Sequence, residues 1–202
     1  MNRGFRKVRA LFAALAAIAA TGCAHQVTFE DASYKTDAKQ QAASVVAVID
    51  KATLENTVAI RSFMTGVANS WEVQSGDMLK QVVDIELPQM FAHYEFATSE
   101  KQPSGSGPGM ILGFTVPNYA FADFHANVSV HVVAKDRSGA QLFEKTYEGE
   151  GDTQGGKMFW GGAFAMKSAI RQSSLDAFKQ IFVKLREDLD ARNARSANAG
   201  TP

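Results

Sequence analysis

The sequence predicts an α+β fold, with an antiparallel sheet of about five to seven strands and two amphipathic helices packed on one face of the sheet. Two observations lead to this prediction. Apolar and polar residues alternate along 121–135, and in two other stretches apolar residues recur every three or four positions. Alternation is typical of a strand with one face in water, and the longer period is typical of a helix with one buried face.

The alternating stretch is predicted to belong to an antiparallel meander. A turn signal at 136–139 (DRSG) follows it, so 141–148 should return as the partner strand, and 110–116 should be the neighbour on the other side. One face of the central strand is apolar, with Ala122, Phe124, Ala126, Val128, Val130, Val132 and Ala134. The other face is polar, with Asp123, His125, Asn127, Ser129 and His131.

Shorter strands are predicted upstream. The β-branched runs 45–49 and 57–64 indicate two strands joined by a short turn region, and 92–97 indicates another. Residues 71–73 are expected to continue the sheet or to lie against it. The glycine-rich segment 104–109 is interpreted as a plain loop, because a phosphate-binding loop would lead into a helix and be followed by a lysine, whereas here a strand follows.

The two helices have different lengths. The first should begin near 75–77, where Ser75 or Asp77 can cap free amides, and should kink or end at Pro88. Its apolar positions are Leu79, Val82, Val83, Ile85, Leu87 and Met90. The second should run over 163–189. Its inward positions are Met166, Ile170, Ser174, Phe178, Ile181, Phe182, Leu185 and Leu189.

Residues 1–22 have the pattern of a secretory signal. A basic head with Arg3, Arg6, Lys7 and Arg9 precedes an apolar run of about a dozen residues, whereas a membrane span needs about twenty. The sequence Ala-Thr-Gly-Cys at 20–23 resembles the lipobox of bacterial lipoproteins, although that family usually has Leu where this chain has Ala20. The resemblance implies that a diacylglycerol is first attached to the Cys23 sulfur, that the signal is then cut between Gly22 and Cys23, and that the new amine of Cys23 is acylated last.

That covalent lipid is the only prosthetic group that the sequence indicates, with no cofactor and no metal. In the lipoprotein family, Asp after the cysteine usually retains the product in the inner membrane. Ala24 therefore implies the periplasmic face of the outer membrane. Cys23 is the only cysteine, which excludes a disulfide framework. Residues 23–202 carry 17 Lys and Arg against 21 Asp and Glu, and this acidic balance argues against nucleic acid as a partner.

The chain after the signal is predicted to form one domain. Residues 23–43 are interpreted as the lipidated N-terminus and a polar tether, in which Val27 and Phe29 have the spacing of an edge strand. Residues 44–190 should make a single α+β domain, and 191–202, which lack apolar periodicity, a disordered tail.

No catalytic constellation is found, so the domain is predicted not to be an enzyme. His125 and His131 share a strand face but lie roughly 20 Å apart, too far for one metal ion. Asp123 is close enough to touch His125, His93 has no evident second ligand, and no serine has a nucleophile motif.

The candidate partner contact is Met158, Phe159 and Trp160, which follow glycines; the alternative is that they fold back as a lid or start the last helix. Trp71 raises the same question, with partial burial expected.

The lipobox, the helix that opens at Ser75-Gly76-Asp77, the meander with its Asp-Arg-Ser-Gly turn and the long closing helix resemble YajG-type lipoproteins and other small envelope-assembly lipoproteins of the outer membrane. That resemblance implies a non-catalytic binding or assembly module of the cell envelope, anchored by its lipid, with an envelope protein or a glycan as partner. Two alternatives remain: a lipid-binding or lipid-transfer accessory lipoprotein with a dry groove between sheet and helices, and a periplasmic hydrolase.

Overall fold

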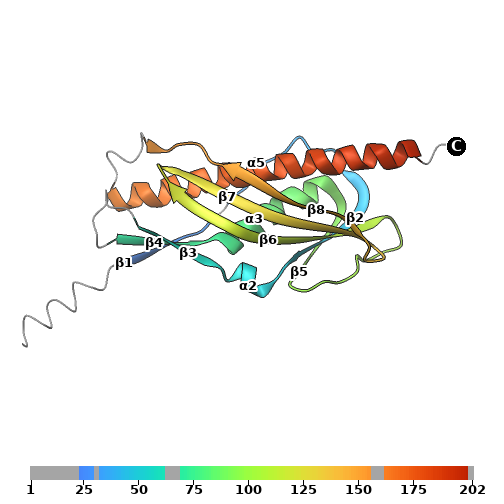
Figure 1. Cartoon of the computed structure of the whole chain (residues 1–202), viewed down its shortest axis with the longest axis horizontal. Coiled ribbons are helices and arrows are strands. Elements are labelled where there is room, and N and C mark those ends of the chain that lie inside the picture. Colours follow the sequence, from blue (N-terminus) through green and yellow to red (C-terminus); the bar gives the residue numbers. More distant parts are fainter. Residues whose placement is uncertain (1–22, 30–31, 62–68, 156–161, 200–202) are drawn as a thin grey trace, which may run out of the picture.

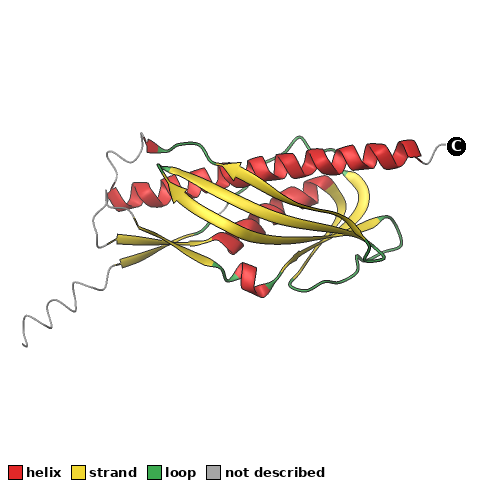
Figure 2. Ribbon diagram, viewed as in Figure 1, coloured by secondary structure: helices red, strands yellow, loops and turns green. Residues whose placement is uncertain are grey.

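The computed structural model describes residues 23–29, 32–61, 69–155 and 162–199, and within them the fold is α+β, as predicted. Figures 1 and 2 show an elongated molecule in which strands and helices lie along a common long axis. The described strands are β1 (Cys23–Val27), β2 (Gln41–Ile49), β3 (Thr57–Arg61), β4 (Asn69–Gln74), β5 (Phe91–Ala97), β6 (Gly109–Ala122), β7 (His125–Asp136) and β8 (Gln141–Glu150). The helices are α2 (Lys51–Leu54), α3 (Ser75–Met90) and α5 (Gly162–Ala199).

The predicted meander is confirmed. β6, β7 and β8 pair antiparallel, and Val130 of β7 faces Tyr147 of β8. The turn between β7 and β8 forms because the Asp136 carboxylate accepts from the amides of Ser138 at 2.8 Å and Ala140 at 3.0 Å, while Gly139 adopts a φ of 89°. The inward residues of β7 from Ala126 to Ala134 are buried, so the alternation marks the two faces of this part correctly. The predicted start of the strand is wrong, because Ala122 is exposed at the end of β6, and Asp123 and Phe124, with φ of 49° and 65°, form the turn between β6 and β7.

The other half of the sheet corrects the prediction of one antiparallel sheet. Five strands form one sheet in the order β5-β2-β6-β7-β8, and β2 pairs parallel with both β5 and β6. Parallel neighbours need a crossover between them, and β3, β4 and α3 lie between β2 and β5 in the chain. The strands β1, β4 and β3 make a separate three-stranded sheet, in which β1 pairs parallel with β4.

The two long helices share one core with both sheets. α5 packs against β7 and β8, α3 packs against β5, β2 and β6, and the helices contact each other. The predicted inward residues of α5 are buried, and Phe182 stacks on Phe114 of β6 with ring centroids 6.0 Å apart. α3 ends two residues after Pro88, as expected, but no side chain caps its start, because the Ser75 hydroxyl is engaged with Asn56.

Small residues let α5 approach the sheet. A Cβ on Gly149 would lie 2.1 Å from the carbonyl oxygen of Ala177, and one on Gly151 would lie 1.8 Å from that of Ser173. Ala126 donates its backbone N–H to the Ser173 hydroxyl at 2.8 Å. The glycines of β8 and the loop after it therefore let α5 pack closely against the sheet at these two positions.

Side chains of α5 also cover the outer edge of β8. Lys184 donates to the carbonyl of Glu148, Gln180 to that of Glu150 and Arg192 to that of Leu142, at 2.6, 2.7 and 3.2 Å. At the opposite edge of the same sheet, β5 has a strand on one side only. One edge of the five-stranded sheet, β8, is thus covered by side chains of α5, while the other edge, β5, is not.

The segments expected to be a tether and a tail have more structure than the sequence suggests. β1 is an edge strand, as its spacing allowed, and Val27 and Phe29 are 0% and 1% exposed. Residues 32–40 then cross α3, where the Tyr34 hydroxyl donates to Glu86 at 2.9 Å and the Thr36 amide donates to Gln89 at 2.9 Å. The range 23–43 therefore differs from a free tether. At the other terminus, α5 continues ten residues past Leu189, to Ala199.

Candidate functional site

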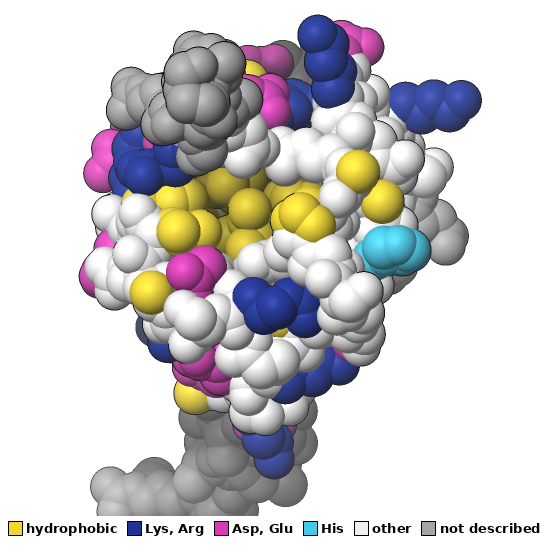
Figure 3. Space-filling view, turned by 90° about the vertical axis from the view of Figure 1, so that its right-hand side faces the viewer, with side chains coloured by type: hydrophobic (Ala, Val, Ile, Leu, Met, Phe, Trp, Pro, Cys, Tyr) yellow, Lys and Arg dark blue, Asp and Glu magenta, His cyan; other side chains and the backbone are white. Residues whose placement is uncertain are grey.

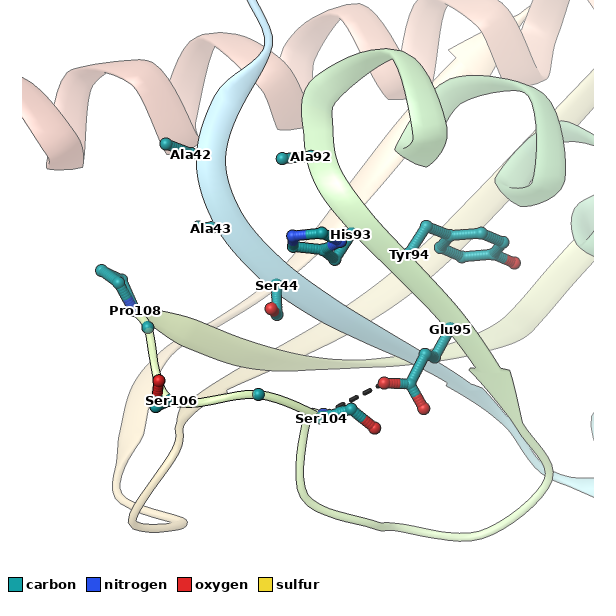
Figure 4. Close-up of a pocket in the computed structure, with 12 residues that line it drawn as sticks. Ala42, Ala43, Ser44, Ala92, His93, Tyr94, Glu95, Ser104, Ser106 and Pro108 are labelled. Carbon is teal, nitrogen blue, oxygen red and sulfur yellow. Dashed lines mark hydrogen bonds between the residues drawn. The ribbon is translucent and has the colours of Figure 1, made fainter.

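A pocket of about 690 Å³ opens on the sheet face that points away from the helices. It lies between the first halves of β2 and β5 and the loop that joins β5 to β6 (Figure 4). Its walls carry small and polar groups: Ala42, Ala43, Ser44, Ala92, His93, Tyr94, Glu95, Ser104, Gly105, Ser106, Gly107 and Pro108.

The parallel pairing of β2 and β5 brings the polar groups of the pocket together. Ser44 lies opposite His93 and Val46 lies opposite Glu95, so Ser44, His93 and Glu95 share the outer face. From the sequence, His93 stood alone and Ser44 was not singled out. The available signal was Ser44, the polar residue directly before the apolar run 45–49. It indicates a site only once β2 and β5 are known to be neighbours.

The loop that forms the lower wall is fixed at several points. Glu95 accepts from the Ser104 amide at 3.0 Å and pairs with Lys101 at 2.6 Å, and Arg137 donates to the Pro103 carbonyl at 2.6 Å. Pro103 is buried, and beneath this loop Val46 and Ile111 are buried on a sheet face that is otherwise mostly polar. The glycine-rich segment is therefore a loop, as predicted, and it is held against the sheet.

The carboxylate of Glu95, which lines the pocket, is already held by the loop. The hydrogen bond from Lys101, with further bonds from Ser104, lowers the pKa of the Glu95 carboxyl to about 2. Glu95 is thus an anion already occupied by the loop (Figure 4). Among the described residues no hydrogen bond joins Ser44 to His93 or His93 to Glu95. The arrangement suits hydrogen bonding to a bound partner.

A second, smaller hollow of about 250 Å³ lies between residues 34–37, α3 and α5. Glu86 is 2% exposed, and burial raises the pKa of its carboxyl. Its Oε2 and the Nη1 of Arg186 are buried without a hydrogen-bond partner, and Lys179 lies over the Tyr34 ring at 4.4 Å.

The histidines of the meander remain apart. His125 contacts the Asp123 carbonyl at 3.2 Å and Glu150 at 3.5 Å, while His131 contacts Glu144 and Thr146, both at 3.1 Å. Within the ranges that the structure describes, no three His, Cys, Asp or Glu residues are grouped to hold a metal ion.

The remaining predicted residues have separate outcomes. Met158, Phe159 and Trp160, and the Gly22 side of the cleavage site, lie outside the described residues. Cys23 is the first residue of β1. Trp71 is 0% exposed and stacks with His25 at 6.0 Å, which is deeper than the partial burial expected. No described helix combines the length and the hydropathy that a bilayer span requires.

Comparison with known proteins gives a weak likeness to a solved structure. No family model matches the chain, and no curated protein matches it. The chain aligns with the crystal structure of a putative lipoprotein from Caulobacter crescentus at 16% sequence identity and a TM-score of 0.35. The alignment covers 58% of this chain and 84% of that one.

Proposed function

We propose that this protein is a lipid-anchored, non-catalytic binding module of the bacterial cell envelope, located on the periplasmic face of the outer membrane. The lipobox resemblance at 20–23 supports the anchor and Ala24 the outer membrane. The pocket between β2, β5 and the following loop supports the binding role, because its hydroxyls, imidazole and backbone groups are available while its carboxylate is occupied. The partner that suits such walls is an envelope protein or a glycan, bound through hydrogen bonds.

Substitution Cys23→Ser tests the anchor. The variant should keep its signal and should incorporate no fatty acid, because the thiol that receives the diacylglycerol is missing. Metabolic labelling with a palmitate analogue, together with the intact mass, measures both effects. Normal cleavage and labelling of Cys23→Ser would contradict the proposal.

Photo-crosslinking in cells tests the binding role. A photoreactive residue at Ser106, in the pocket loop, should give one dominant adduct, which mass spectrometry of the crosslinked species would identify as protein or glycan. The same residue at Lys51, which is exposed at the start of α2, is the matched control. His93→Ala should reduce the Ser106 adduct without changing the Lys51 pattern. Equal adducts at both positions would refute a specific partner in this pocket.

Lipid binding is the second candidate, favoured by one observation. Figure 3 shows apolar side chains gathered in a hollow at the end of the molecule away from β1. Leu142, at the start of β8, is 45% exposed. Organic extraction of the chain from Ala24 onward, which lacks both the signal and the covalent lipid, followed by mass spectrometry should release a stoichiometric lipid if this candidate is correct. An extract without lipid would exclude it.

A further inference from the structure

The lipid-bearing residue has no spacer between it and the folded domain. Cys23 is the first residue of β1 and lies opposite Asn69 of β4, and the pairing continues to Val27 opposite Val73. Arg61, Ser70 and Ala24 occupy one row across β3, β4 and β1. Because neighbouring strands lie about 4.8 Å apart, Arg61 is roughly 10 Å from the residue that follows the anchor.

β1 is packed on the domain, so it does not detach to lengthen the link between the lipid and the fold. Val27 and Phe29 are buried, His25 stacks on Trp71, and the Phe29 ring meets Phe178 of α5 edge-on at 6.1 Å. Detaching β1 would expose these apolar groups, and each of the two large side chains contributes on the order of 2 kcal/mol through burial.

The pocket lies at the other end of the molecule. β1, β3 and β4 are together at one end of the long axis, and the loop between β5 and β6 is at the other (Figure 1). Phe29 is about 20 Å along the strand direction from Cys23. Its partner Phe178 is about 18 Å along α5 from Asp190, which accepts a hydrogen bond from Gln41 at the start of β2. The pocket is therefore about 40 Å from the anchor.

We infer that the end formed by β1, β3 and β4 is the surface that meets the lipid bilayer, and that the molecule stands on it with the pocket about 40 Å away from the membrane surface. The inference rests on the proposed acylation of Cys23. An orientation in which the outer face of the sheet contacts the membrane is disfavoured. Glu144, Glu148 and Glu150 are exposed on that face, and an anionic bilayer would repel them.

Contact quenching of a fluorophore by a nitroxide on the lipid headgroups tests this orientation. Acylation blocks Cys23, so a cysteine introduced at Arg61 or at Ser106 is the only thiol of the acylated full-length protein. After labelling and incorporation into vesicles of phosphatidylethanolamine and phosphatidylglycerol, the label at Arg61→Cys should lose most of its fluorescence. The label at Ser106→Cys should keep its fluorescence.

A linker variant provides the control. Twenty Gly and Ser residues inserted between Cys23 and Ala24 span roughly 25 Å, so the difference between the two labels should shrink. Equal quenching of both labels on acylated protein without the linker would overturn the orientation. An intact mass without acyl chains on Cys23 would instead overturn the proposed anchor, and the orientation with it.

Discussion

Substituting Gly151 by Ala tests how α5 is docked on the sheet. The new Cβ would lie 1.8 Å from the Ser173 carbonyl oxygen and 2.4 Å from the Ser173 hydroxyl. The same hydroxyl accepts from the Ala126 amide at 2.8 Å, and Gly151 donates its own amide to the Ala126 carbonyl at 2.8 Å. Because the obstructing atom is backbone, α5 must move away by more than about 1 Å to admit the methyl group.

The free-energy cost follows from three contributions. Overpacking of this kind costs about 1–3 kcal/mol. Withdrawal of Ser173 leaves the buried amide of Ala126 without an acceptor, which costs about 1–3 kcal/mol. Replacing glycine restricts the unfolded chain and returns about 0.4–1 kcal/mol. We therefore expect Gly151→Ala to lower the free energy of unfolding by about 1–5 kcal/mol, a large part of the stability of an ordinary domain.

Gly107 provides the matched control, since a Cβ added there would have no atom within 4 Å and its φ is not positive. Gly107→Ala should change the free energy of unfolding by no more than about 1 kcal/mol. Urea unfolding of the chain from Ala24 onward, followed by tryptophan fluorescence, measures both variants. If the two differ by less than about 0.5 kcal/mol, α5 is not seated on β8 as described.

The remaining predictions concern the core and one buried acid. Phe182→Ala should lower the free energy of unfolding by about 3–5 kcal/mol, because it removes the ring stacked on Phe114. The control, Val183→Ala at an exposed neighbour, should change it by no more than about 0.5 kcal/mol. Similar urea midpoints for the two variants would contradict the packing. Burial raises the pKa of Glu86, so the folded protein holds this proton more tightly than the unfolded chain, and stability falls as pH rises from the unfolded pKa through the folded one. Glu86→Gln, which can still accept from Tyr34, should therefore exceed wild type in stability at neutral pH, with the gain vanishing in acid; an equal gain at every pH would show that ionisation is not its cause.

The sequence was most informative where structure is local. The order and antiparallel pairing of β6, β7 and β8 depend on alternation within single strands and on the turn at Asp136, all within about forty residues, and they were predicted correctly. The turn at Asp123 and Phe124 was missed, because the alternation of apolar and polar residues continues through it. The helical period identified α3 and the buried face of α5 in the same way, because neighbouring turns of one helix bury one stripe. These features need no knowledge of distant partners.

Pairing between distant segments was not predictable from such patterns. The β-branched run of β2 suits a parallel or an antiparallel neighbour equally, and its position between β5 and β6 is decided by the crossover through α3. The polar range that suggested a tether is held by the bond from Tyr34 to Glu86, two residues 52 positions apart. The pocket was missed for the same reason, since Ser44 and His93 become neighbours only through the β2–β5 register.

The unequal edges of the five-stranded sheet have a consequence for self-association. Lys184, Gln180 and Arg192 occupy backbone carbonyls along β8, so another chain cannot add a strand there without displacing α5. β5 has no such cover beyond the bond from Gln40 to the Phe91 carbonyl, as far as the described residues show. A strand of another copy can therefore join this sheet only beside β5. If two copies pair antiparallel through β5, each uses its one open edge, so the result is a closed dimer and not an open fibre.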